Sequence, residues 1–200
     1  GRVHSRPLMP MAHELLRQAG LAPADVDLFA AAVGPGSFTG VRIGVAAVKG
    51  LAFAADKPCA GVPTLDAMAE NLAHLDRAVV CAVMDARRGQ VYNAVYDVSG
   101  GGIRKRVPDR AVSADTLTDE MKNEKNCVFY IGDGARLCYN MSREKGPGAS
   151  LAPPQLLNQN AAGVAAAAYK IWLAGGAVGA DELNPVYLRL PQAEREIKGN

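Results

Sequence analysis

The sequence lacks the cysteine and histidine spacings that build metal sites or disulfide frameworks. Its four cysteines lie 22, 46 and 11 positions apart, which matches neither CxxC metal spacing nor a short disulfide-bonded secreted domain. Its three histidines, His4, His13 and His74, include no i, i+4 pair that one helix could present to a metal. We therefore expect reduced thiols in a cytoplasmic protein, with no metal site.

Charge of one sign and long hydrophobic runs are also scarce. The 22 Lys and Arg residues nearly balance the 20 Asp and Glu residues, so a net charge of +2 gives no broad field that would attract nucleic acid. If the protein serves RNA, we expect it to do so indirectly, through a partner. No uninterrupted apolar run reaches the roughly 18 residues that span a bilayer, and no basic-then-apolar signal segment opens the chain. We expect no membrane partner.

The order of apolar segments predicts an α/β protein. With 200 residues, 49% of them hydrophobic, the chain can form one large domain or two small ones. Strands and helices alternate up to Asp76, and the sequence pattern of a β-hairpin follows. We therefore place a subdomain boundary between residues 76 and 77. We expect helices near 7–19, 38–55, 65–75 (capped by Thr64), 115–122 (exposed) and 161–174, strands at 28–33, 59–62, 79–84, 91–97, 103–112 and 128–131, and an extended tail at 185–189.

A glycine-rich turn, Gly34-Pro35-Gly36-Ser37-Phe38-Thr39-Gly40, joins the strand 28–33 to a long helix. Ser37 or Thr39 can cap that helix and leave its first N–H groups facing outward, where they attract anions. The candidates for an anion-facing loop are thus Gly34, Gly36, Ser37 and Thr39. The alternative is a turn that only connects the strand to the helix and binds no ligand. The turn is neither a Walker loop nor a GxGxxG loop. Residues 128–134 repeat the arrangement, which hints at two related halves.

Several charged residues allow two interpretations. Asp85, which precedes Arg87-Arg88, can be a carboxylate near a phosphate, although turn-stabilising charges are the more frequent explanation. Arg42 and Lys49 on the helix 38–55 are more typical of a solvated face than of an anion clamp.

Five segments together resemble one family. They are the glycine-rich turn with Arg42, Gly44 and Lys49, then Val62-Pro63-Thr64-Leu65-Asp66, then Asp85 to Tyr92, then Tyr187-Leu188-Arg189, and His4-Ser5 with Leu8, Met9 and Pro10 at the start. In this order they resemble the TsaB (YeaZ) family over nearly the whole chain. The resemblance implies the actin/Hsp70-like (ASKHA) nucleotidase fold with two related subdomains, 1–76 and 77–200. Family members have further strands before the position of Gly1, so we expect the first subdomain to lack them here and the sequence to be part of a longer protein.

The resemblance implies a role without catalysis. TsaB is a scaffold in making N6-threonylcarbamoyladenosine at position 37 of tRNA; it binds the catalytic subunit TsaD and, through that heterodimer, the ATPase TsaE. TsaD holds a metal on a His-x-x-x-His helix, and Thr64 and Met68 stand at the corresponding positions here. Neither is a ligand of a catalytic divalent ion, and Ser37 lacks a nucleophile elbow. We expect no catalytic residue, metal or cofactor.

The resemblance also implies a partner surface. The helices 7–19 and 38–55 carry apolar stripes, and the small residues Gly40, Gly44 and Ala47 permit close approach of another helix. It implies that these helices pack on TsaD or on a second copy of the chain; the alternative is that the stripes face the chain's own core. The predicted interface residues are Leu8, Met11, Leu15, Val41, Val45 and Val48.

Two other functions stay open. One is an enzyme of the same superfamily, either an ATP-dependent phosphotransferase or an M22-type glycoprotease-like protein, with ATP near Gly34-Pro35-Gly36 and Gly132-Asp133-Gly134. The other is a homodimeric interaction module with unrelated partners.

Overall fold

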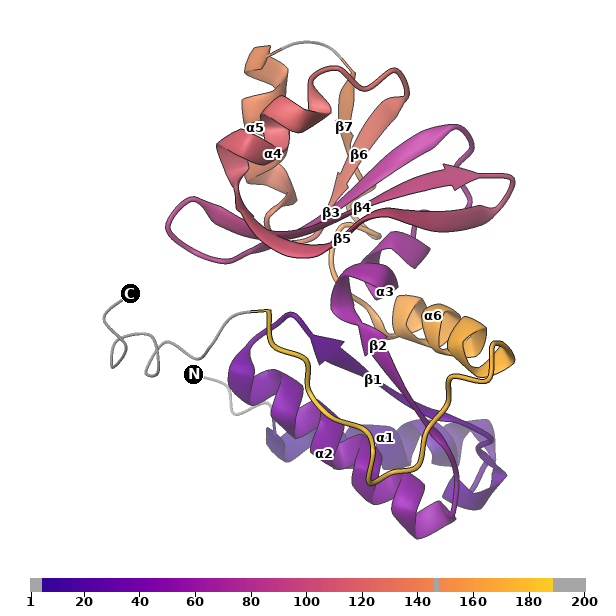
Figure 1. The fold of residues 1–200 in the computed structure, drawn as a ribbon. Coiled ribbons are helices and arrows are strands. Elements are labelled where there is room, and N and C mark those ends of the chain that lie inside the picture. Colours follow the sequence, from indigo (N-terminus) through magenta and orange to yellow (C-terminus); the bar gives the residue numbers. More distant parts are fainter. Residues whose placement is uncertain (1–4, 146–147, 189–200) are drawn as a thin grey trace. The chain divides into compact units, whose positions relative to one another are not determined.

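The computed structural model of the chain describes residues 5–145 and 148–188, which form two compact units (Figure 1). Unit 1 comprises residues 5–63 and 167–187, and unit 2 comprises the rest. The predicted boundary between residues 76 and 77 falls inside unit 2, because the helix that begins at Thr64 packs on the strands of that unit. The division into subdomains at that boundary stays a prediction. His4 and Arg189, two of the residues that carry the family resemblance, lie outside the described residues.

Unit 1 is a parallel strand pair covered by helices. The strands β1 (Phe29–Gly34) and β2 (Cys59–Pro63) pair in parallel, with Phe29 opposite Cys59. A parallel pair needs a crossover, and α2 (Phe38–Ala55) supplies it, with the bounds that the sequence predicts. Alternate residues of β1 are buried and pack with Val45 and Ala52 of α2 in one core cluster. The remaining elements are α1 (Ser5–Ala19), which contacts α2, and the 3-10 turn η1 (Pro23–Asp25).

Unit 2 is a mixed five-stranded sheet in the order β5-β4-β3-β6-β7. The predicted hairpin is confirmed as the antiparallel pair of β3 and β4, and β6 lies parallel to β3 on its other edge. The sequence did not predict β7, because three residues are too short for a recognisable pattern. The elements are α3 (Thr64–Glu70), β3 (Ala78–Asp85), β4 (Gln90–Ser99), β5 (Gly102–Ser113), α4 (Ala114–Met121), β6 (Cys127–Ile131), α5 (Ala135–Lys145) and β7 (Ala149–Leu151).

Three predicted elements differ from the structure. The helix α3 ends at Glu70 rather than near Leu75, because residues 71–74 form turns. Thr64 is its first residue and is buried, so it does not stand before the helix as a cap. The helix α4 is not simply exposed, since Ala114, Leu117, Thr118 and Met121 form a buried stripe at i, i+3, i+4 and i+7.

The alanine-rich helix and the tail after it complete the chain. The helix α6 (Ala161–Leu173) is confirmed within one residue. The predicted extended tail forms no strand, but the Val186 N–H donates to the Val33 carbonyl oxygen at 2.8 Å, and Val178 forms a bridge with Cys59. The segment 177–187 therefore joins both strands of unit 1 by backbone hydrogen bonds.

By length and composition one described helix, α2, could cross a membrane, with 18 residues and a mean hydropathy of 1.4. The helix is not an uninterrupted apolar run, because Arg42 and Lys49 interrupt it. One such helix is weak evidence for a span, since a helix that packs on a sheet passes the same test, and α2 packs on β1.

Candidate partner-binding surface

The helix α1 presents an exposed apolar face in unit 1. Leu8, Met11 and Leu15, at i, i+3 and i+7, have exposed fractions of 37%, 67% and 69%. Residues at this spacing lie on one side of a helix. Met9 and Leu21 add further exposed apolar area at either end. All three residues predicted on this helix are thus available to a partner.

The three residues predicted on α2 are less available. Val45 is only 3% exposed and packs in the core cluster of unit 1, so its predicted place in an interface is corrected: it is a core residue. Val41 and Val48 are half-buried against the same cluster. The stripe of α2 therefore faces its own sheet, which was the alternative that the sequence left open. The exposed large apolar residues of α2 are instead Phe38, at the start of the stripe, and the 83% exposed Phe53, which stands beside the stripe and was missed for that reason.

The glycine-rich turn after β1 is shaped by the chain itself. The Gly40 N–H donates to Ser37 Oγ at 3.3 Å, so the predicted cap of α2 is Ser37. Gly34 has a φ of 124°, and a Cβ there would overlap the carbonyl oxygen of Val186. This glycine is needed because another backbone segment passes close to it. That approach accounts for Gly34 without a ligand, and the anion-facing role of Gly34, Gly36, Ser37 and Thr39 stays a prediction.

Two motif residues that are far apart in the sequence meet at the start of α2. Arg42 Nε donates to the Tyr187 hydroxyl at 2.8 Å, and the Arg42 guanidinium carbon lies 3.9 Å from the centroid of the Phe38 ring. The rings of Phe38 and Tyr187 stack with centroids 5.1 Å apart. Two helical turns further along α2, Lys49 Nζ donates to the Asp181 carbonyl oxygen at 3.0 Å. The prediction of a simply solvated face is therefore wrong for these cations, which hold the C-terminal segment on α2.

The positions that the family resemblance compares with metal ligands are packed in unit 2. Thr64 is 6% exposed and Met68 is fully buried in the core, where a Cβ on Gly132 would lie 3.1 Å from its sulfur. A hydroxyl and a thioether in a dry core are poor ligands for a hard or borderline cation. Within residues 5–145 and 148–188, no three His, Cys, Asp or Glu side chains are grouped as a metal site would require.

A polar network ties α3 to the sheet of unit 2. The Tyr96 hydroxyl donates to Asp66 Oδ1 at 2.6 Å, and Lys105 Nζ lies 2.5 Å from Asp66 and 2.7 Å from Asp109. Burial, and then the neighbouring Asp66 carboxylate, raise the pKa of the Tyr96 phenol far above its usual range. The phenol stays protonated and donates to the carboxylate, so the motif residue Asp66 has a structural partner.

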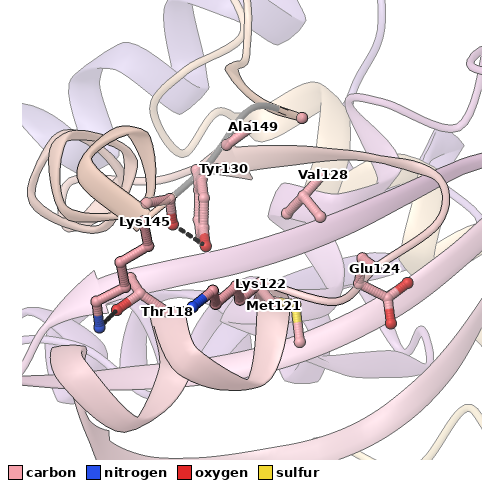
Figure 2. A pocket seen from close by; sticks show the side chains of 10 residues that line it. Thr118, Met121, Lys122, Glu124, Val128, Tyr130, Lys145 and Ala149 are labelled. Atoms are coloured by element: carbon pink, nitrogen blue, oxygen red, sulfur yellow. Dashed lines mark hydrogen bonds between the residues drawn. The ribbon is translucent and has the colours of Figure 1, made fainter.

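Figure 2 shows a cavity of unit 2 between α4, α5 and β6. Its volume is about 20 Å³, roughly the space of one water molecule. The Tyr130 hydroxyl and Ser142 Oγ lie 2.8 Å apart, and Lys145 Nζ donates to Thr118 Oγ1 at 2.8 Å, so these polar groups satisfy each other (Figure 2). The cavity is too small for a nucleotide.

The chain is similar to known proteins in sequence and in fold. The family model described as "TsaD: tRNA N6-adenosine threonylcarbamoyltransferase" matches residues 1–171. Proteins named "tRNA threonylcarbamoyladenosine biosynthesis protein TsaB" are 38% identical over 67% of this chain in Bacillus subtilis and 32% identical over 99% of it in Escherichia coli. The chain spans 58% of the Bacillus relative and 86% of the Escherichia relative.

Two solved structures from Pseudomonas aeruginosa are similar to the chain. One, described as an uncharacterized protein with similarity to peptidase YEAZ, superposes with a TM-score of 0.79 at 32% identity and covers 94% of this chain and 85% of its own. The other, described as YeaZ, has a TM-score of 0.75 at 30% identity with the same coverage.

The mixed α/β units and these likenesses define the class of protein: an actin/Hsp70-like (ASKHA) fold, as the sequence predicts. Within this class the structural neighbours and the named relatives agree on one branch. The chain belongs to the TsaB (YeaZ) family.

Proposed function

We propose that the chain takes part in threonylcarbamoyladenosine formation in tRNA as a non-catalytic subunit that binds a TsaD transferase and, through the heterodimer, the ATPase TsaE. The names of its TsaB relatives support the pathway. The match of a TsaD family model to residues 1–171 supports a shared fold between the chain and the proposed partner.

The exposed apolar face of α1 carries the proposal of partner binding. Leu8, Met11 and Leu15 leave large apolar side chains in water, and full burial of one such side chain contributes about 1.5 to 3 kcal/mol. Apolar residues grouped at the centre of a surface are typical of interfaces. A partner helix laid along α1 would cover all three.

The packed positions of Thr64 and Met68 support the absence of catalysis. If a helix at this place held a metal in a transferase, its ligands would have to be exposed imidazoles or carboxylates. Here the two side chains belong to the interior of unit 2. The chain's role is then to bind and orient, while the partner carries out the chemistry.

The test is complex formation with purified TsaD, measured by size-exclusion chromatography with light scattering. The chain is expected to elute with TsaD as one species at micromolar concentration. Met11→Glu/Leu15→Glu should prevent this, because it would bury two carboxylates in the contact. His13→Glu, exposed on another side of α1, should bind normally. Equal binding by the double variant would mean that TsaD contacts a surface other than α1. No binding by the unaltered chain would refute the proposal that TsaD is its partner.

A second measurement addresses the enzyme alternative. Calorimetric titration of the isolated chain with ATP and Mg²⁺ should show no tight binding. Tight binding, with turnover of ATP by the chain alone, would favour a phosphotransferase instead.

A further inference from the structure

The connection between β3 and β4 in unit 2 contains two consecutive arginines in the left-handed conformation. Arg87 and Arg88 have φ values of 66° and 55°, and Gly89 follows with 71°. This conformation is unfavourable for residues with a Cβ, and hairpins that need it usually contain Asn and Gly. Of the other described residues with this feature, Asp56 is the C-cap of α2. Arg77, with a φ of 50°, has it at an exposed bend. In the connection itself the Gln90 N–H donates to the Arg87 carbonyl oxygen at 3.1 Å and closes a tight turn, so the unusual feature is that arginines occupy a turn of this kind.

Hydrogen bonds hold this connection in place. The Arg87 N–H donates to Asp85 Oδ1 at 2.7 Å, and the Asp85 N–H donates to Asp133 Oδ1 at 3.1 Å. The Ala114 N–H, at the start of α4, donates to the Gly89 carbonyl oxygen at 3.0 Å. The turn therefore rests on β3, on the turn before α5 and on the start of α4. Asp85 therefore acts as a turn-stabilising charge, the more frequent of its two predicted roles.

A third arginine also lies at an unfavourable position, in a segment that is hydrogen-bonded to β3 just before this connection. Arg136 lies exposed in the first turn of α5, where a cation opposes the helix dipole. It follows Asp133, whose carboxylate binds the Asp85 N–H, so the first turn of α5 and the arginine pair are neighbours. Arg87, Arg88 and Arg136 thus stand on two segments that a hydrogen bond joins at one end of the sheet, each at a position that local energetics disfavour.

The three guanidinium groups have no partner in the part of the chain that the structure describes. Arg104, Arg106 and Arg110 of the same unit all form ion pairs. The carboxylates near the cluster, Asp85 and Asp133, each use Oδ1 to accept a backbone N–H. Local rules that are broken repeatedly at one place, without an internal gain, are expected at functional sites.

We propose that Arg87, Arg88 and Arg136 contact phosphate groups of the tRNA, an inference that rests on the proposed function and extends it. Guanidinium groups bind phosphate oxygens in bidentate fashion. Exposed side chains on a hairpin tip suit an extended polyanion, whereas a free nucleotide needs a concave site. A low net charge does not oppose this, because the contact is local. The chain then touches its RNA directly rather than only through TsaD.

The test measures binding of an unmodified tRNA transcript to the assembled complex of the chain with TsaD, over a range of salt concentrations. Arg87→Ala/Arg88→Ala is expected to weaken binding roughly 10- to 30-fold near 0.15 M salt. It should also reduce the slope of log K against log salt by about 2, one for each lost phosphate contact. A purely structural role would leave that slope unchanged.

The matched control is Lys122→Ala/Lys125→Ala, which removes the same charge from exposed positions between α4 and β6. It should bind tRNA as the unaltered complex does. Equal affinity and slope for the arginine variant, or an equal loss in the lysine control, would overturn the proposal.

A further variant and a competition measurement separate loss of RNA binding from a folding defect and from nucleotide binding. Arg87→Asn/Arg88→Gly suits the backbone better and must still lose tRNA affinity, so a folding defect cannot imitate the result. Displacement of tRNA by ATP at this site, abolished by the same substitution, would overturn the RNA assignment in favour of a nucleotide. Complex formation is measured separately, and the titration is repeated on the chain alone, so failure of TsaD binding and failure of RNA binding are distinguishable.

Discussion

Unit 1 and unit 2 each contain a strand that ends at a glycine and leads into a helix. Gly34 after β1 and Gly132 after β6 have φ values of 124° and 110°. In both, a Cβ would overlap a carbonyl oxygen, that of Val186 for Gly34 and that of Val83 for Gly132. The predicted repeat of strand, glycine turn and helix therefore occurs in both places, with the same backbone requirement.

The two junctions differ in what lies against the glycine. Val83 belongs to β3, which is paired on both edges in the sheet of unit 2. Val186 belongs to the C-terminal segment, which at this point is held by one backbone hydrogen bond to Val33 and by the contacts of Tyr187, and further back by the bridge of Val178 to Cys59 and the bond from Lys49 to Asp181. The neighbour of the glycine is thus a strand paired on both edges in unit 2, and a segment with a single backbone hydrogen bond at that point in unit 1. The difference shows that a glycine turn in a sequence need not indicate a ligand.

The largest expected effect compares alanine at the two glycines. Gly132→Ala should lower the free energy of unfolding by about 4 kcal/mol, because the backbone of β3 cannot move away. Gly34→Ala should cost about 2 kcal/mol, because the C-terminal segment can shift and lose its contacts. Denaturant unfolding with a far-ultraviolet and a near-ultraviolet probe measures both.

Gly100→Ala is the control for these two variants. It has a φ of 57° with no atom near its Cβ position, so it reports the conformational cost alone, about 1 kcal/mol. Equal losses at Gly34 and Gly132 would show that the two neighbours are equally fixed.

The second effect concerns the segment that covers the turn of unit 1. Tyr187→Ala should cost about 2 kcal/mol, because it removes the ring stack on Phe38 and the hydrogen bond from Arg42. Tyr187→Phe keeps the stack and should cost about half as much. Hydrogen exchange at the Val186 N–H reads this effect locally. Unchanged protection in Tyr187→Ala would mean that the backbone bond alone holds the segment.

The third effect is an increase in stability, and it concerns the turn between β3 and β4. Arg87→Asn/Arg88→Gly should raise the free energy of unfolding by about 1 to 2 kcal/mol, since both residues then fit the left-handed conformation. Thermal unfolding measures it, with Lys122→Ala/Lys125→Ala as the control for lost charge. A loss of stability would mean that the arginine side chains make stabilising contacts.

The smallest effect is a pH dependence of unit 2. Burial raises the pKa of the Cys138 thiol to about 12. A thiol with this folded pKa contributes stability fully below its unfolded pKa, near 8.5, and loses it as the pH rises toward 12. The loss should be on the order of 1 kcal/mol at pH 9.5. Cys138→Ala should show a shallower decline between pH 8 and pH 10; an identical decline would assign it to other groups.

The sequence predicted these regions unevenly, for physical reasons. The helix 38–55 and its Ser37 cap were predictable because the apolar period and the capping residue are local signals. Val45 could not be assigned to the core, because a stripe alone does not say which surface covers it. The contact of Val186 with Gly34 and that of Tyr187 with Arg42 join residues far apart in the chain. The φ values of Arg87 and Arg88 belong to a local turn that the bonds of Arg87 to Asp85 and to Gln90 close, and the sequence did not indicate them because arginine rarely adopts this conformation.

Unit 1 needs residues 167–187 to complete it, whereas unit 2 is almost entirely one continuous stretch of chain. On the ribosome, the central stretch can fold soon after it emerges, while the first strand pair waits for the last helix and the segment behind it. During that interval the apolar residues of α1 and α2 are open to chaperones and to premature association. A stop codon just before Tyr187 would then destabilise unit 1, although its two strands are synthesised before unit 2.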